Sequence, residues 1–441
     1  MGRIDMASER AYESSASASK KGTLGELSVE KKLPLSDRLW LGSLIALPYV
    51  SYAALLVMLV PFLGALFRRG KKVMSRCGQR GFSWLALAML MSACFALDKG
   101  EGFLQLTNFL PFFVLFGVLT TVPSVVARPF EQLEGLAHWL VVSSIPISLG
   151  AIAEFIIKFE AIAPNAQAVL PPWLAANIYE PDYGHRAHSV FSHPNMLSAY
   201  LVILLGLGLG LILKALNTRD SSPGVWWQVS ALLLCIAAIF CTGSRNGLLI
   251  AGVLMTIALY AARRHRWVLL CGSALGGLLV SAAFAFGIGG RSLSLALVTQ
   301  DPRLGVWRLA IEMVKERPWV GWGFSGLRQL YIPGSIPEYD VIHHAHNFWL
   351  FLASEAGIPV TICFCVVIGT VYYDGVRTYF EVSDRAILRP ILLSYLLAFT
   401  SSILFGLFDV AVFDSRVNLV NWVLISAIYV LSCATRSLQQ K

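Results

Sequence analysis

The chain has 441 residues, of which 56% are hydrophobic and only 14% are charged. A soluble domain carries roughly 25% charged residues, so this composition excludes a water-soluble enzyme. The net charge of +9 would suit a nucleic-acid partner, but the basic residues cluster at the ends of apolar segments, where they act as topology signals. We therefore expect no nucleic acid among the partners.

Residues 1–36 are polar and rich in Ser, Glu and Lys. They lack the short apolar region and cleavage site of a signal peptide, so we expect a disordered cytoplasmic tail. The next segment, Leu39 to Phe67, is a long apolar run with Pro48 inside it, and a densely basic loop from Arg68 to Arg80 follows. Both flanks should face the cytoplasm, which predicts a hairpin of two helices.

Further apolar runs follow along the chain, most of them long enough to cross a hydrocarbon core of roughly 30 Å as a helix. They cover approximately residues 82–97, 103–122, 133–157, 195–217, 225–241, 246–261, 267–289, 348–371, 386–409 and 417–433. With the hairpin, the pattern predicts an all-α polytopic membrane protein with about twelve transmembrane helices. The transmembrane domain would cover 37–434, followed by a cytoplasmic C-terminus at 435–441.

Two long segments remain on the non-cytoplasmic side, residues 158–194 and 290–347, and function is expected there because binding residues concentrate in loops. The second contains an amphipathic helix, roughly Pro302 to Arg317. Its expected apolar stripe, which we place against the bundle, consists of Leu304, Trp307, Ile311 and Val314.

The outer segments are rich in arginine, whose planar guanidinium binds phosphate oxygens bidentately. A lipid-linked phosphate or diphosphate is therefore a natural ligand, although some of these residues would only contact lipid headgroups. Arg245 is the sharpest candidate because it lies between two apolar runs with almost no loop, where a charge is costly; snorkelling to the interface is the alternative. The outer arginines are Arg186, Arg245, Arg291, Arg303, Arg308, Arg317, Arg328 and Arg416.

Six of the eight histidines also lie in the two outer segments: His185, His188, His193, His343, His344 and His346. Histidine exchanges a proton near neutral pH, so a general base is expected among them. His346 is the best candidate because it directly precedes Asn347, where the loop enters an apolar segment. A hydrogen-bonding cap is the alternative role.

Zinc binding by the histidine clusters is an open alternative, and two acidic pairs, Glu180-x-Asp182 and Glu338-x-Asp340, add further oxygen ligands. Their spacing is too common to be specific, so we expect neither a metal nor another cofactor. Gly321-x-Gly323-x-x-Gly326 matches the dinucleotide fingerprint as a string but lacks the flanking strand, which predicts a flexible turn instead.

Four stretches resemble the O-antigen ligase and polymerase superfamily of bacterial envelope proteins. Arg186 to Leu197 is similar to the family segment in which a Pro-Asn pair, here Pro194 and Asn195, opens a helix. Arg245 to Leu249 resembles the arginine-x3-leucine element, and Arg303 to Gly323 the Arg-, Trp- and Gly-containing outer loop. His346-Asn347 followed by Gly357 resembles the ligases' histidine element, although Val360 departs from the residues usual there.

This resemblance implies a fold like that of the C-type glycosyltransferases and a site facing the periplasm from the bacterial inner membrane. It implies transfer of the glycan from undecaprenyl diphosphate-linked O-antigen to lipid A-core oligosaccharide, inverting and without metal, in lipopolysaccharide biosynthesis. His346 would be the base and Arg245 a second catalytic residue. The expected substrate-binding residues are Arg186, Arg291, Arg303, Arg308, Asn195 and Asn347.

Other functions also fit the pattern. An O-antigen polymerase would use the same donor, and a protein O-oligosaccharyltransferase of the same superfamily usually carries a larger outer domain. A transporter or flippase is a remote alternative. It should show internal repeats and charges near the middle of the bilayer, and the sequence has no clear repeat and few such charges.

Overall fold

The computed structural model describes residues 34–158, 171, 183–287, 301–337, 339–382 and 386–439. Within these ranges the chain is helical, without strands apart from an isolated bridge between Ile336 and Tyr339. Eight helices are long and apolar enough to span a membrane, and three further apolar helices are shorter. The chain is therefore an all-α polytopic membrane protein, as its composition predicts, while the total of about twelve spans stays a prediction.

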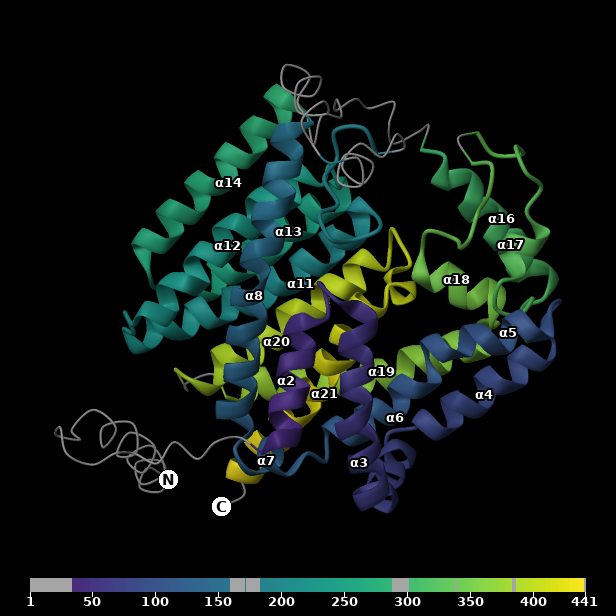
Figure 1. Ribbon diagram of the computed structural model, residues 1–441, viewed down its shortest axis with the longest axis horizontal. Coiled ribbons are helices and arrows are strands. Elements are labelled where there is room, and N and C mark those ends of the chain that lie inside the picture. Colours follow the sequence, from purple (N-terminus) through teal and green to yellow (C-terminus); the bar gives the residue numbers. More distant parts are fainter. Residues whose placement is uncertain are drawn as a thin grey trace.

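The helices fall into three groups along the chain (Figure 1). The first group is α2 (Leu35–Ala46), α3 (Ser51–Gln79), α4 (Phe82–Cys94), α5 (Lys99–Gln105), α6 (Leu110–Leu119), α7 (Pro123–Ala127) and α8 (Pro129–Ile157). The second is α11 (Pro194–Thr218), α12 (Pro223–Cys241), α13 (Arg245–Ala261) and α14 (Arg266–Phe286). The third is α16 (Arg303–Glu316), α17 (Gly326–Leu330), α18 (Phe348–Glu355), α19 (Ile358–Glu381), α20 (Leu388–Phe405) and α21 (Ser415–Gln439).

The predicted hairpin is confirmed: α2 and α3 pack against each other and are joined by a turn that contains Pro48. The first of its helices has only 12 residues, fewer than the roughly 20 that a straight membrane span needs. The beginning of α2, the end of α21 and α7 lie at one end of the bundle, and the chain around α16 lies toward the other (Figure 1).

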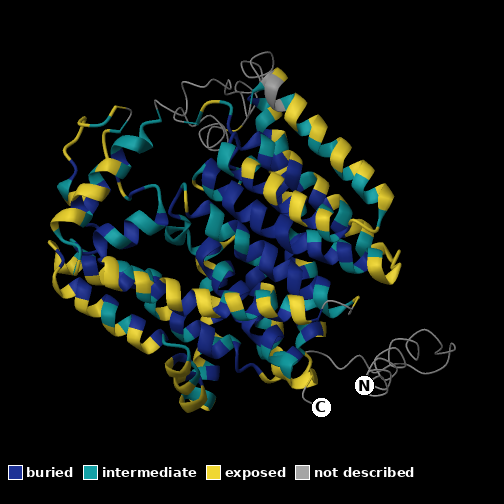
Figure 2. Cartoon of the chain, turned by 180° about the vertical axis from the view of Figure 1, so that it is seen from behind, coloured by how far each residue is buried: buried dark blue, intermediate teal, exposed yellow. Residues whose placement is uncertain are grey.

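The core of the bundle is built around α11, which packs along α20. Gly206 and Gly210 let the two backbones approach closely, because a Cβ atom at either position would lie 2.6 Å from Ala398 N or 2.3 Å from Ser394 Oγ. Small residues at this spacing are typical of membrane helix packing. Buried residues concentrate here, and the exposed ones, many of them apolar, face outward as expected beside lipid (Figure 2).

The amphipathic helix is confirmed as α16, but its predicted inward stripe is wrong. The buried residues are Val306, Ala310 and Met313, whereas Ile311 is exposed. The helix packs on α18, and Ala310 on its buried face is fully buried. The prediction followed the largest apolar side chains and therefore missed the face that is buried.

The apolar run 348–371 is not one helix. It divides into α18 and α19 at Gly357, whose φ of +89° favours glycine. Gly321 fits against this break, since a Cβ there would lie 2.3 Å from the carbonyl oxygen of Glu355. The glycine-rich segment that we expected to be a flexible turn is therefore closely packed against the break between α18 and α19.

Candidate active site

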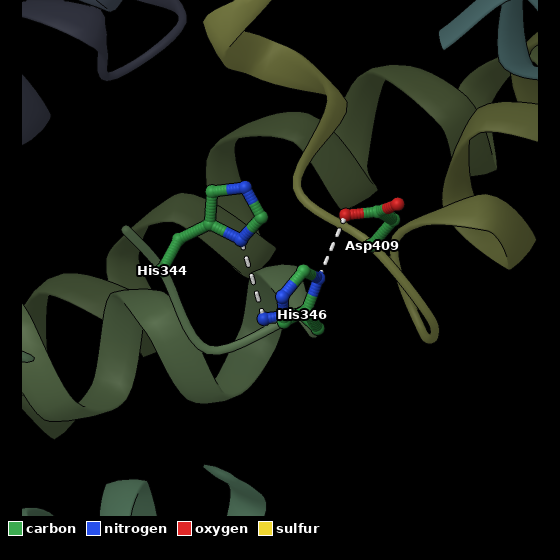
Figure 3. A group of neighbouring side chains, drawn as sticks. All are labelled: His344, His346 and Asp409. Atoms are coloured by element: carbon green, nitrogen blue, oxygen red, sulfur yellow. Dashed lines mark hydrogen bonds and ion pairs between the residues drawn. The ribbon is translucent and has the colours of Figure 1, made fainter. Parts of the chain in front are cut away.

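His346 and Asp409 face each other from two loops at the end of the bundle that carries α16 (Figures 1 and 3). His346 lies just before α18, and Asp409 lies between α20 and α21. The Nδ1 atom of His346 is 3.4 Å from Oδ1 of Asp409. The Asp409 side chain is buried, whereas that of His346 keeps 21% of its surface exposed. A substrate can therefore reach the imidazole but not the carboxylate.

The backbone of His346 has a φ of +47°. This left-handed conformation is uncommon for a residue with a side chain and costs free energy, so the surrounding structure must hold it. Asn347 contributes by capping α18: its Oδ1 accepts the N–H groups of Trp349 and Leu350 at 3.0 Å, and its Nδ2 donates to the Leu407 carbonyl. The polar atoms of Asn347 thus hold the two loops together.

Asp409 is held as a carboxylate. Burial alone would raise its pKa, but the hydrogen bond from His346, the positive charge of Arg303 and the charges that His346 and His344 carry when protonated outweigh burial and hold the pKa well below its usual range. An ionised acceptor beside Nδ1 favours the tautomer with its proton on that atom. The Nε2 atom of His346 is then free to accept a proton.

Asn195, at the start of α11, connects Asp409 to an arginine. Its Nδ2 donates to Asp409 Oδ2 at 2.9 Å, and its Oδ1 accepts from Arg186 Nη2 at 2.6 Å. Arg186 is buried and also donates from Nε to the Thr242 carbonyl at 2.9 Å. The structure thereby joins the predicted residues Arg186, Asn195 and His346 through Asp409, which the sequence analysis did not identify.

A buried ion pair anchors the segment that carries Arg186. Lys158 Nζ lies 2.7 Å from Glu154 Oε1 and donates to the Arg186 carbonyl at 2.8 Å. The Glu154 carboxylate also accepts the backbone N–H groups of His188 and Ser189. Burying these two charges is tolerable because each is paired and hydrogen-bonded. Lys158 thus has a structural role.

The other predicted arginines differ in position. Arg245 begins α13, three residues after Thr242, so it extends from the same short turn that holds Arg186. Arg303 begins α16 close enough to Asp409 to lower its pKa. Arg308 lies farther along α16 and is exposed. Arg291 falls outside the described residues.

Two more histidines border the site. Burial lowers the pKa of His193 to about 4 against the opposing charge of Asp409, and burial together with the charge of His346 lowers that of His344 to about 4. His193 Nδ1 accepts the backbone N–H of Asn195 and so caps α11. Both imidazoles are therefore neutral near pH 7, and neither is poised to exchange a proton there.

Among the described residues, His344, His346 and Asp409 form a group whose potential metal-binding atoms all lie within 4.8 Å of one another. Two ligands of one tetrahedral zinc ion lie about 3.4 Å apart, as follows from bonds of roughly 2.0–2.1 Å. His346 Nδ1 and Asp409 also already face each other, and the backbone N–H of His346 points to His344 Nδ1 at 3.4 Å. An ion held here would have to take the place of these two contacts. Of the acidic pairs, Glu180, Asp182 and Glu338 lie outside the described residues.

An apolar cavity of about 100 Å³ opens beside these loops. Its walls include Phe348 and Trp349, directly after the His346 loop, and Ala411 and Val412, two and three residues after Asp409. The rest of the wall comes mainly from α19, α20 and α21. The apolar cavity thus adjoins the polar pair His346 and Asp409.

Asp409 was missed because sequence patterns do not reveal which loops meet. The available signal was an acidic residue at the end of an apolar run, where a charge requires a partner. Arg416, one of the outer arginines, binds Asp414 and the Val190 carbonyl. It thereby ties this loop to the segment that carries Arg186.

Comparison with known families supports the resemblance noted in the sequence. Residues 230–365 match the family model described as O-antigen ligase, whereas a search of the curated proteins found no match. The matched range contains Arg245, Arg303 and His346. Arg186, Asn195 and Asp409 lie outside it, yet the fold brings them to the same site.

Proposed function

We propose that the chain is an O-antigen ligase, which transfers the glycan of an undecaprenyl diphosphate-linked O-antigen to lipid A-core oligosaccharide at the periplasmic face of the inner membrane. The family match supports a membrane glycosyltransferase of the ligase or polymerase type. The observation that carries the proposal is the His346–Asp409 pair. It supplies an oriented base next to arginines that suit a diphosphate.

In the proposed reaction, Nε2 of His346 removes the proton from the acceptor hydroxyl. The hydroxyl oxygen attacks the anomeric carbon as the bond from that carbon to the diphosphate oxygen breaks, so the configuration inverts. The lipid diphosphate leaves with the bonding electron pair. Asp409 stabilises the resulting imidazolium, a role for which a buried carboxylate hydrogen-bonded to the ring is suited.

Arginine side chains of this site would stabilise the charge that develops on the leaving diphosphate. Arg245 and Arg303 are the first candidates because they begin helices that border the site. Arg186 already donates to Asn195 and the Thr242 carbonyl, so we assign it chiefly to holding the base pair in position. Fixed donors aimed at a developing anion can contribute several kcal/mol.

The apolar lining of the cavity is compatible with the lipid part of the donor. An isoprenoid chain has no polar atoms, and Phe348, Trp349 and Val412 present it with aromatic and aliphatic side chains. Because these residues adjoin the two loops of the base pair, a chain lying there would place its diphosphate near His346.

Gel analysis of lipopolysaccharide from a deletion strain tests the function. A ligase predicts free lipid-linked polymer and an unsubstituted core. A core bearing a single repeat would instead identify a polymerase. Restoration by the wild-type gene but not by a His346→Ala variant of equal abundance would connect the phenotype to this site.

The orientation is tested separately by cysteine labelling. An impermeant reagent applied to intact spheroplasts should label a cysteine at exposed Trp319 but not one at exposed Lys72. The reverse pattern would contradict a periplasmic site.

A further inference from the structure

A cluster of arginines lies at the end of the bundle opposite His346. Arg80 Nη1 and Arg436 Nη2 bind the two oxygens of Asp374 at 3.1 and 3.0 Å. Arg76 donates to the hydroxyl of Tyr429, and the guanidinium groups of Arg76 and Arg80 lie over its ring at 5.2 and 4.4 Å from the centroid. We call these five residues the arginine cluster.

The cluster carries more positive charge than it neutralises. Three guanidinium groups against one carboxylate leave a net charge of +2 among its members. Arg76 and Arg80 are four residues apart at the end of α3, a spacing at which like charges repel on a helix. An anion bound between them would reduce this repulsion. It would also accept hydrogen bonds from guanidinium N–H groups that the single carboxylate of Asp374 cannot satisfy.

Three candidate membrane spans end at the cluster. Arg80 directly follows α3, Arg436 lies in the last turn of α21, and Asp374 lies near the end of α19. The ends of spans lie at the depth of the lipid headgroups. Tyr373, beside Asp374, exposes 65% of its surface, and exposed aromatic residues are enriched at this depth.

We propose that the arginine cluster binds the phosphodiester of an anionic membrane lipid. The cluster residues come from three rigid helices and are partly buried, with 23% of the Arg80 side chain and 40% of the Arg436 side chain exposed. They can therefore hold one headgroup in a fixed position, whereas a basic surface would only attract anionic lipids without fixing any one of them. This site is independent of the proposed transfer reaction.

The test is native mass spectrometry of the delipidated full-length protein titrated with dioleoylphosphatidylglycerol or dioleoylphosphatidylcholine. We expect one retained molecule of the anionic lipid, bound about tenfold or more tightly than the zwitterionic one. Equal binding of the two lipids would overturn the proposal. So would displacement of the anionic lipid by millimolar inorganic phosphate, which would identify a soluble ligand.

Two charge-matched variants locate the site. R76Q/R80Q/R436Q should lose the preference for the anionic lipid, whereas R68Q/K71Q/K72Q removes the same charge from exposed positions of α3 and should keep it. Equal losses would show diffuse attraction only and would contradict a specific site. If R76Q/R80Q/R436Q misfolds, the single variant R76Q tests the site instead, because it leaves both ion pairs to Asp374 intact. It should weaken binding by severalfold.

Discussion

Asn195 donates a 2.9 Å hydrogen bond to Asp409, a residue 214 positions away in the sequence. The bond leaves Oδ1 of Asp409 for His346 and therefore fixes how the carboxylate meets the imidazole. Asn195→Ala should lower turnover by roughly 10- to 100-fold, since a misoriented base loses most of its advantage. Single-turnover transfer measures this effect. The matched control is Asn217→Ala at the exposed far end of the same helix, and an equal loss there would contradict the positioning role.

His346→Ala should reduce turnover by roughly 10²–10⁴-fold, the range typical of general-base loss, while donor affinity changes little. Asp409→Asn should also slow transfer severely, because an amide no longer stabilises the imidazolium. His343→Ala is the control, since this neighbouring histidine is exposed. If His346→Ala binds donor poorly but transfers it normally at saturation, His346 is a donor-binding residue.

Arg245→Ala and Arg303→Ala should weaken donor binding as well as turnover, because a diphosphate would lose a charge-assisted contact in both the ground state and the transition state. Lysine at either position should restore the function only in part, since the planar fork is lost. Donor titration and single-turnover rates in nanodiscs separate the two effects. Lys315→Ala, on the exposed side of α16, should leave both unchanged; full rescue by lysine would argue against bidentate binding.

Acid should destabilise the folded protein between about pH 6.5 and 4. His193 and His344 have folded pKa values of about 4, below the usual 6.5, so the unfolded chain binds more protons in this window. Stability is then fully present above pH 6.5 and falls as the pH drops. Asp409, whose folded pKa is lowered, adds a further loss that sets in only as the pH approaches the ordinary aspartate value of about 4.

His193→Asn isolates one of these groups. Asparagine is itself a favourable N-cap and can keep an acceptor for the Asn195 N–H while removing the titration. Melting temperatures in detergent should fall less steeply between pH 6.5 and 4.5 than in the wild type. An unchanged slope would assign the acid sensitivity to other groups; His343→Asn, at an exposed position, serves as the control.

Glycan transfer by the purified protein should survive treatment with EDTA. The expectation rests on the sequence, in which the spacing of the histidines and carboxylates is not specific for a metal site. The same assay with added Zn²⁺ or Mg²⁺ is the control. Loss of activity on chelation, restored by a divalent cation, would establish His344, His346 and Asp409 as a metal site.

Local features of the fold were predictable from the sequence. The hairpin of α2 and α3 followed from Pro48 and the basic residues after the apolar run, although the structure places these basic residues up to Gln79 in α3 and not in a loop; α16 followed from its periodicity. Its buried face did not, because that face includes a small residue, Ala310, that hydropathy underweights. The break at Gly357 was also hidden, since an apolar run gives no sign of a positive φ.

The candidate site was predictable one residue at a time. His346 and Arg186 could be proposed from the chemistry of their side chains and their position at the ends of apolar runs. Their connection through Asp409 could not, because His346 and Asp409 are 63 residues apart and meet only when α18, α20 and α21 pack together. Tertiary packing therefore supplied the partner that gives the histidine its orientation.

The residues around His346 come from both sides of the matched range 230–365. That range is consequently not a portable unit. A chimera that exchanged it alone between two such proteins would pair the base of one parent with the carboxylate of the other. A functional graft would have to carry the start of α11 and the connection between α20 and α21 as well, so specificity in this protein cannot be reprogrammed by swapping one contiguous cassette.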